Sequence, residues 1–555
     1  MSGNKVLAPA ARFETYCLSI GLWVVASFAV FLVATSVLRG LHIVAPLASA
    51  VTAFCLAGGL VRWSLQPSLR GLLAALLSVG LLGLLAILVA SGVRDISFEG
   101  QAIHFPSALE IADGLNPLTT GYFSAVYPNG LWTLQGLFIS LTPWLDAGLE
   151  AGKAPAGLLA VASIPLIAVA LRSLRGAWTP AVVVASVLVQ ANPVMLLQLT
   201  SFELDGVVYS LVVTAVAGAI LLPTCHRRTG LVALCGAILL LVNTKITGLY
   251  WAGLIAPAVL LQAGLDQRTL PVRLMVLLSS VFAIALLIVG WRPYVTVLLG
   301  TGEIFGATTE VVLGAANLRD AGPLLRMAFL LFGKSSNPVG AEQAHLKWPG
   351  ELSSDEFVSL FDIRNGGFGP WFGLQTMGTL LVGGIALWRT RRSVCQGQAW
   401  IGPFWTAIVF MASLFFPISW WARLVSPFWL VAVLPLVWRT GNARQTGSWL
   451  AVLTRVGWAL AMAGVMVNMA AVAVSLTSVM TTNRAITQVL AAVAQDGDAV
   501  RIVPSTAPDL DGTSSIWEQR LIRASIYPRV GPATGCRRPL FSAGSVQLCI
   551  DEQAP

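Results

Sequence analysis

Long apolar runs separated by short polar stretches dominate the chain. About thirteen of these runs approach the ~20 residues that an α-helix needs to cross a bilayer. The runs on either side of Asn243 could also form one long, broken helix. The pattern predicts an all-α polytopic membrane protein. Its predicted spans are residues 17–38, 43–61, 71–93, 155–172, 179–197, 206–223, 229–243, 247–263, 274–291, 373–388, 401–417, 423–438 and 447–477.

Composition supports this class of protein. Hydrophobic residues make up 56% of the 555 residues and charged residues only 11%, which leaves too little polar surface for a soluble globule. The net charge of +9 comes from short basic clusters between apolar runs, as in the cytoplasmic loops of membrane proteins. We therefore expect a membrane lipid environment and no nucleic-acid partner.

The distribution of charge predicts an orientation. Basic residues collect in alternate loops, for example at Arg62 and Arg70 and again at Arg227 and Arg228. The positive-inside rule assigns these loops to the cytoplasm. Acidic residues collect mainly in the intervening loops. With thirteen crossings, the N-terminus is predicted to be cytoplasmic, and the C-terminus and the acidic loops extracytoplasmic.

Three regions follow from this pattern. Residues 1–70 form an N-terminal two-helix membrane segment, and residues 71–478 form the main membrane region, with large outer loops at 94–153 and 292–372. Residues 479–555 lose the long apolar runs and are predicted to form a small soluble domain outside the cytoplasm. Cys536 and Cys549 lie in this region, where they could oxidise to a disulfide that closes a short loop.

The first outer loop holds the main candidate site. Its segment RDISFEGQAIHFPSALEIADGLNP places Asp95, Glu99 and His104 just after an apolar span. Carboxylates at a membrane surface mark a functional site unless they are merely solvated, and a solvated loop is the alternative here. A turn is expected to lead into a short helix over Ser107–Asp113, and Leu131–Leu141 predicts a second one. Both are expected to lie as amphipathic helices on the membrane surface.

Other charged residues fall at the predicted ends of spans. Asp205 could be a helix N-cap or part of a site. Lys245 could snorkel to the interface or offer its ammonium to a phosphate. Arg423, beside Trp420 and Trp421, could anchor an aromatic belt or bind a lipid-linked phosphate.

Asp362 and Arg364 belong to a glycine-rich stretch, DIRNGGFGPWFG, before a predicted span. Glycines permit a tight turn or a close backbone approach. A simple turn from loop to helix is the plainer interpretation. A contact with substrate at the outer mouth of that span is the other.

Several strings, taken in order, resemble the GT-C superfamily of integral-membrane glycosyltransferases. The resemblance is to bacterial members related to the protein mannosyltransferase and lipid A aminoarabinose transferase groups, and it implies a bacterial inner-membrane location and a polyprenyl-phosphate-linked sugar as donor. The strings cover most of residues 94–440: FEGQAIHFPSALEIADGLNP, NPVMLLQLTSFELDG, NTKITGLYW, WRPYVTVLLG, DIRNGGFGPWFG and WWARLVSPFWL.

The resemblance also implies roles for individual residues. Glu99 matches the family's catalytic acid in the first outer loop, with Asp95 as the reserve, and Arg423 matches the arginine that contacts the donor phosphate. From its charge near the outer face, and not from the resemblance, Lys245 is expected to be a second phosphate ligand. From their positions in the outer loops and at the ends of spans, His104, Asp205, Asp362 and Arg364 are expected to bind substrate.

The expected reaction is a single displacement that inverts the anomeric carbon, with Glu99 as base and Arg423 and Lys245 stabilising the departing phosphate. No cofactor or metal site is expected, although Asp95 and Glu99 could share a divalent cation. The sugar and the acceptor are not specified by the sequence. Alternative functions are a polysaccharide polymerase or ligase and a multi-spanning transporter of lipid-linked glycans.

Overall fold

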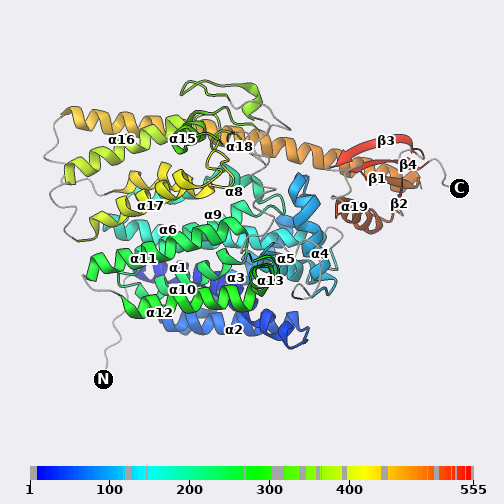
Figure 1. Ribbon diagram of the computed structural model, residues 1–555, viewed down its shortest axis with the longest axis horizontal. Helices are drawn as coiled ribbons and strands as arrows, with labels where there is room; N and C mark the ends of the chain where they lie inside the picture. The colour runs from blue at the N-terminus through cyan, green and yellow to red at the C-terminus, as the bar shows by residue number, and fades with distance from the viewer. Residues whose placement is uncertain are drawn as a thin grey trace.

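The computed structural model is a bundle of helices with a small domain at one end (Figure 1). The residues that it describes are 9–116, 118, 127–145, 148–267, 271–302, 318, 320–336, 345–357, 363, 365–390, 397–438, 448–496, 498–504, 512–526, 528–531, 534, 536–543 and 546–551.

The bundle consists of the helices up to α18, and Figure 1 shows most of them running in roughly the same direction. Their bounds are α1 Pro9–Gly40, α2 Pro46–Leu65, α3 Leu69–Ser91, α4 Phe105–Ala112, α5 Gly130–Ser140, α6 Ala154–Arg175, α7 Pro180–Gln190, α8 Pro193–Gln198, α9 Asp205–Leu221, α10 Arg227–Val242, α11 Ile246–Gln267, α12 Val272–Ile284, α13 Thr296–Thr301, α15 Pro323–Phe332, α16 Phe372–Thr390, α17 Ile401–Phe415 and α18 Ser448–Asp496.

Seven helices among the described residues are long and apolar enough to cross a membrane, and five shorter apolar helices accompany them. The chain is therefore a multi-pass helical membrane protein. Every predicted span overlaps helical structure. The count of thirteen crossings stays a prediction.

The predicted span 423–438 is not an α-helix. It folds as two short 3₁₀ helices, η8 Ser426–Ala432 and η9 Leu434–Val437, which begin next to Pro427 and Pro435. Proline lacks the backbone N–H that would continue an α-helix. Both short helices are fully buried, so other helices surround this irregular backbone, as the hydrocarbon region requires.

Small residues bring α16 and α18 close together. A Cβ atom on Gly378 would lie 2.6 Å from the carbonyl oxygen of Gly457, and one on Gly457 would lie 2.9 Å from the carbonyl oxygen of Gly378. Such contacts allow membrane helices to approach at short range. Helix α18 continues without a break through residue 478 to Asp496 and extends beyond the bundle to carry the C-terminal domain (Figure 1).

The C-terminal domain is a four-stranded sheet with one helix, α19 Gly512–Arg523. The strand order is β2-β1-β4-β3, with β1 parallel to β2 and antiparallel to β4. Cys536 on β3 and Cys549 on β4 form a disulfide, with Cα atoms 5.6 Å apart. This is the pair that the sequence suggested. The strand bounds are β1 Val500–Pro504, β2 Pro528–Val530, β3 Cys536–Ala543 and β4 Val546–Asp551.

Both predicted helices of the first outer loop are present, as α4 and α5. The expectation that the second lies on the membrane surface is wrong, because every residue from Gly130 to Ile139 is buried. The two helices pack tightly against each other: a Cβ atom on Gly136 would lie 2.9 Å from the carbonyl oxygen of Ala108. The loop is therefore a packed layer that can hold side chains in fixed positions.

Candidate active site

The turn that carries Glu99 is held in place by Asp95. The Asp95 carboxylate accepts hydrogen bonds from the backbone N–H of Ser97 (2.7 Å) and of Phe202 (2.8 Å). A Cβ atom on Gly100 would lie 2.1 Å from this carboxylate, so only glycine fits at that position. A π-helical turn, η1 Gly100–His104, follows and leads into α4, which agrees with the predicted turn before a helix.

Asp95 is therefore placed to shape the loop. It is fully buried, and burial raises the pKa of its carboxyl group. Each of its two carboxylate oxygens accepts a hydrogen bond from one of these backbone N–H groups. No group of three or more candidate metal ligands occurs within the described part of the chain.

Glu99 contacts Arg423, which lies 324 positions away in the sequence. Arg423 Nη2 is 2.5 Å from Glu99 Oε1, and Arg423 Nη1 is 3.5 Å from Glu203 Oε2. Beside them, Lys245 Nζ donates to Asp205 Oδ1 over 2.8 Å. We call Glu99, Glu203, Asp205, Lys245 and Arg423 the charged cluster.

Neighbouring polar side chains fix the parts of this cluster relative to one another. Asn192 caps α8 through its side-chain oxygen and donates its amide to the carbonyl of Ser426 over 3.0 Å. The Ser426 hydroxyl in turn donates to the carbonyl of Asp205 over 3.2 Å. These bonds tie the segment after Arg423 to the start of α9. Gln198 Nε2 donates to Glu203 over 3.0 Å.

The structure argues against three purely structural roles that the sequence left open. Asp205 does not act as an N-cap, because it is the first residue of α9 and its carboxylate accepts from Lys245. Lys245 does not snorkel, because it is 6% exposed and paired. The tryptophans Trp420 and Trp421 are buried and form no interfacial belt around Arg423.

The cluster has a strong electrostatic effect on Glu99. Burial alone would raise the pKa of Glu99, but the guanidinium of Arg423 and the ammonium of Lys245 lower it well below the usual carboxyl range. Burial likewise opposes the charge on Lys245, yet Asp205 and Glu99 outweigh it and raise the pKa of Lys245. Both side chains are therefore charged at neutral pH. The Glu99 side chain remains 19% exposed.

His104 lies next to the cluster and is neutral. Burial, followed by the charge of Lys245, lowers the pKa of His104 to about 3. Trp132 Nε1 donates to His104 Nδ1 over 3.3 Å, which assigns the remaining ring proton to Nε2. His104 can thus offer a neutral N–H donor to a ligand.

The structure brings together Glu99, His104, Asp205, Lys245 and Arg423 out of the candidate residues from the sequence. Asp362 and Arg364 lie outside the described residues. Sequence reasoning assigned no site role to Glu203, although its place two residues before Asp205 in a polar break between apolar runs was an available signal.

The C-terminal domain touches this loop directly, which the sequence did not predict. Trp517 Nε1 on α19 donates to Gln101 Oε1 over 2.9 Å, two residues after Glu99. Arg520 Nε donates to Glu150 Oε1 over 3.0 Å, and its Nη2 donates to the carbonyl of Asp95 over 3.1 Å. Helix α19 therefore packs against the turn that carries Glu99 and helps to hold it in place.

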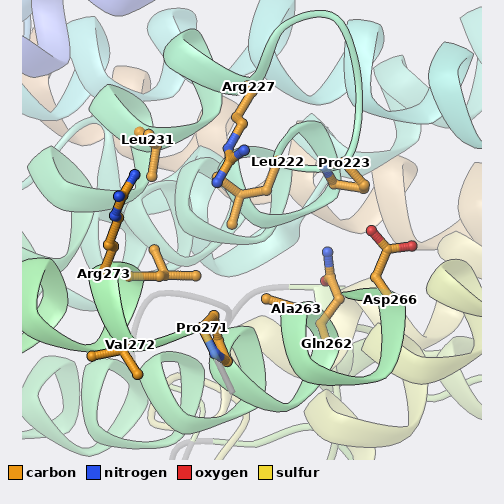
Figure 2. Close-up of a pocket in the computed structure, with 11 residues that line it drawn as sticks. Leu222, Pro223, Arg227, Leu231, Gln262, Ala263, Asp266, Pro271, Val272 and Arg273 are labelled. Carbon is orange, nitrogen blue, oxygen red and sulfur yellow. The ribbon is translucent and has the colours of Figure 1, made fainter. Parts of the chain in front are cut away.

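A hollow of about 370 Å³ lies elsewhere, where α9 ends, α10 and α12 begin and α11 ends (Figure 2). Arg227, Arg273 and Asp266 lie around it (Figure 2), and both arginines are exposed. None of the candidate residues from the sequence lines this hollow.

No family model matches this chain. No curated protein matches it either. Among solved structures, the chain is similar to ArnT from Cupriavidus metallidurans, whose crystal structure contains bound undecaprenyl phosphate. The two chains are 13% identical and superpose with a TM-score of 0.45 over 85% of this chain and 97% of ArnT. A likeness at this level does not carry a functional assignment.

Proposed function

We propose that this protein is a membrane glycosyltransferase of the GT-C type, which transfers a sugar from a polyprenyl-phosphate donor to an acceptor hydroxyl. The observation that carries the proposal is the contact of Glu99 with Arg423, together with Lys245 close enough to lower the pKa of Glu99. A carboxylate and two cations at one site match the needs of this reaction: a base for the acceptor and positive charge for a phosphate leaving group. The ordered sequence strings of the GT-C resemblance support it independently.

In the proposed reaction the acceptor oxygen forms a bond to the anomeric carbon as the bond from that carbon to the phosphate oxygen breaks. Glu99 takes the proton of the acceptor hydroxyl. Arg423 and Lys245 stabilise the negative charge that grows on the departing polyprenyl phosphate. The single displacement inverts the anomeric carbon, and His104 donates to the substrate from Nε2.

The charge balance of the cluster suggests how binding would prepare Glu99. Three carboxylates here face two cations, so an arriving phosphate must compete with Glu99 for Arg423. A phosphate that takes Arg423 removes the cation that depresses the pKa of Glu99 and adds a negative charge nearby. Both changes raise the pKa of Glu99, which makes the carboxylate a better base only when the donor is present.

The test is the variant Glu99→Gln, assayed for release of free polyprenyl phosphate from a polyprenyl-phosphate sugar in reconstituted vesicles. We expect the release rate to fall at least about 100-fold, since a positioned base contributes roughly that factor or more. Binding of polyprenyl phosphate should persist or strengthen, because a competitor for Arg423 is gone. Glu110→Gln, at an exposed residue of α4, is the matched control.

Unchanged release by Glu99→Gln, in protein that is folded and inserted, would remove Glu99 as the base. The same vesicles separate the alternative functions. Movement of the intact lipid-linked glycan across the bilayer without bond cleavage would indicate a transporter. Transfer onto a growing glycan chain would indicate a polymerase or ligase.

A further inference from the structure

A second cationic position lies outside the charged cluster, at the end of α1. Arg39 is in the last turn of α1 and is 9% exposed. Its hydrogen bond is to a neutral group, the hydroxyl of Thr133, at 3.5 Å. Among the described residues, no carboxylate lies within ion-pair distance of Arg39. A buried guanidinium with five N–H groups and no anionic partner is costly.

The Arg39 side chain lines a groove of about 390 Å³. No nitrogen of Arg39 is both fully buried and unpartnered, so the N–H groups that Thr133 does not accept from keep some access to solvent. Ser36 and His42 line the groove as well. Part of the lining is apolar and exposed: Leu287 and Trp291 are 56% and 44% exposed.

The groove lies at a membrane boundary on the same side as the charged cluster. It sits where two candidate membrane spans end, Ala11–Gly40 and Val272–Val289. Thr133, the partner of Arg39, follows Trp132, which donates to His104. Helix α5 therefore contacts both the arginine of the groove and the histidine beside the charged cluster.

From this arrangement we infer that the groove binds a phospholipid, with its phosphodiester on Arg39 and its chains along the exposed apolar wall. A phosphodiester carries one negative charge and so matches the single guanidinium, which can donate two parallel hydrogen bonds to it. Exposed tryptophan at the same level suits the interface between head groups and chains. This site is distinct from the proposed donor site and does not depend on sugar transfer.

The test is native mass spectrometry of the full-length protein titrated with phosphatidylglycerol. For the wild type we expect one tightly held lipid. Arg39→Gln should weaken that adduct at least about tenfold, because a charge-assisted hydrogen bond is worth on the order of 1.5–3 kcal/mol and 1.4 kcal/mol is tenfold in affinity. Arg70→Gln, which removes an exposed arginine at the start of α3, is the matched control and should leave the adduct unchanged.

A second variant tests the site with Arg39 retained. Ser36→Asp places a carboxylate three residues before Arg39 on the same helix, within reach of its guanidinium, and should also expel the lipid. Retention of the adduct by Ser36→Asp, or by a folded Arg39→Gln, would overturn the proposal. Displacement of the adduct by polyprenyl phosphate at equal concentration would overturn it as well, since the occupant would then be the donor lipid.

Discussion

At the scale of single residues, the candidate site is built from charged side chains that pair across long stretches of sequence. The sequence identified Glu99, Lys245 and Arg423 as charges at the ends of spans. It could not show that Glu99 and Arg423 touch, because pairing over 324 positions is set by tertiary packing. The same limit applied to Asp95, whose role in holding the turn depends on the backbone of Phe202.

His104 provides a test of burial that is independent of the enzyme assay. Its pKa of about 3 in the folded protein lies below the unfolded value of about 6.5. As pH falls, His104 is therefore protonated in the unfolded chain before it is protonated in the folded protein. This difference lowers the free energy of unfolding. Between pH 7 and pH 5, His104 should lower the free energy of unfolding by about 2 kcal/mol.

The measurement for His104 is apparent thermal stability in detergent at both pH values. The wild type should lose more stability on acidification than His104→Gln, which cannot titrate. Equal losses in the two proteins would show that His104 is protonated in the folded state. Glu99 does not interfere, because its lowered pKa makes it titrate at more acidic pH.

At the scale of elements, the long apolar runs predicted most helices but not the irregular ones. Helix α15 is only 10 residues long, too short for a rule based on membrane thickness. The two prolines in η8 and η9 broke a run that reads as apolar throughout. The sheet of the C-terminal domain has short strands interrupted by register shifts, so its alternation is weak in the sequence.

The contact between α19 and the first outer loop gives a prediction at this scale. Arg520→Met should destabilise the protein by about 3 kcal/mol, since removing one partner of a buried ion pair leaves the other without compensation. The loss of stability is limited because Lys153, which lies 3.0 Å from Glu150, still pairs with that carboxylate. Thermal unfolding and protease sensitivity of the C-terminal domain are the measurements.

Arg523→Met, at an exposed residue of the same helix, is the control for Arg520→Met. It should leave stability within about 0.5 kcal/mol of the wild type. If the two variants had the same stability, Arg520 would not hold α19 in place. Another contact would then have to support the turn that carries Glu99.

At the scale of the whole molecule, the proposal requires the cluster and the C-terminal domain to lie outside the cytoplasm. The Cys536–Cys549 disulfide fits an oxidising compartment. Cys225 is a free, exposed thiol between α9 and α10, next to basic residues, and we expect it to be cytoplasmic.

A membrane-impermeant maleimide should therefore label Cys225 only after the membrane is permeabilised. Loss of the signal in Cys225→Ser identifies the site of labelling. Labelling of Cys225 in intact spheroplasts would place that loop outside. The proposed orientation of the charged cluster would then be reversed.

The most direct test of the central claim is mass spectrometry of the lipid that copurifies with the protein. The account predicts a polyprenyl phosphate, or its glycoside, bound to the wild type and reduced at least about tenfold in Arg423→Gln, since the lost charge-assisted hydrogen bonds are worth more than 1.4 kcal/mol. Absence of any prenyl lipid from the wild type, or full retention by folded Arg423→Gln, would contradict the claim that this cluster holds a lipid-linked phosphate.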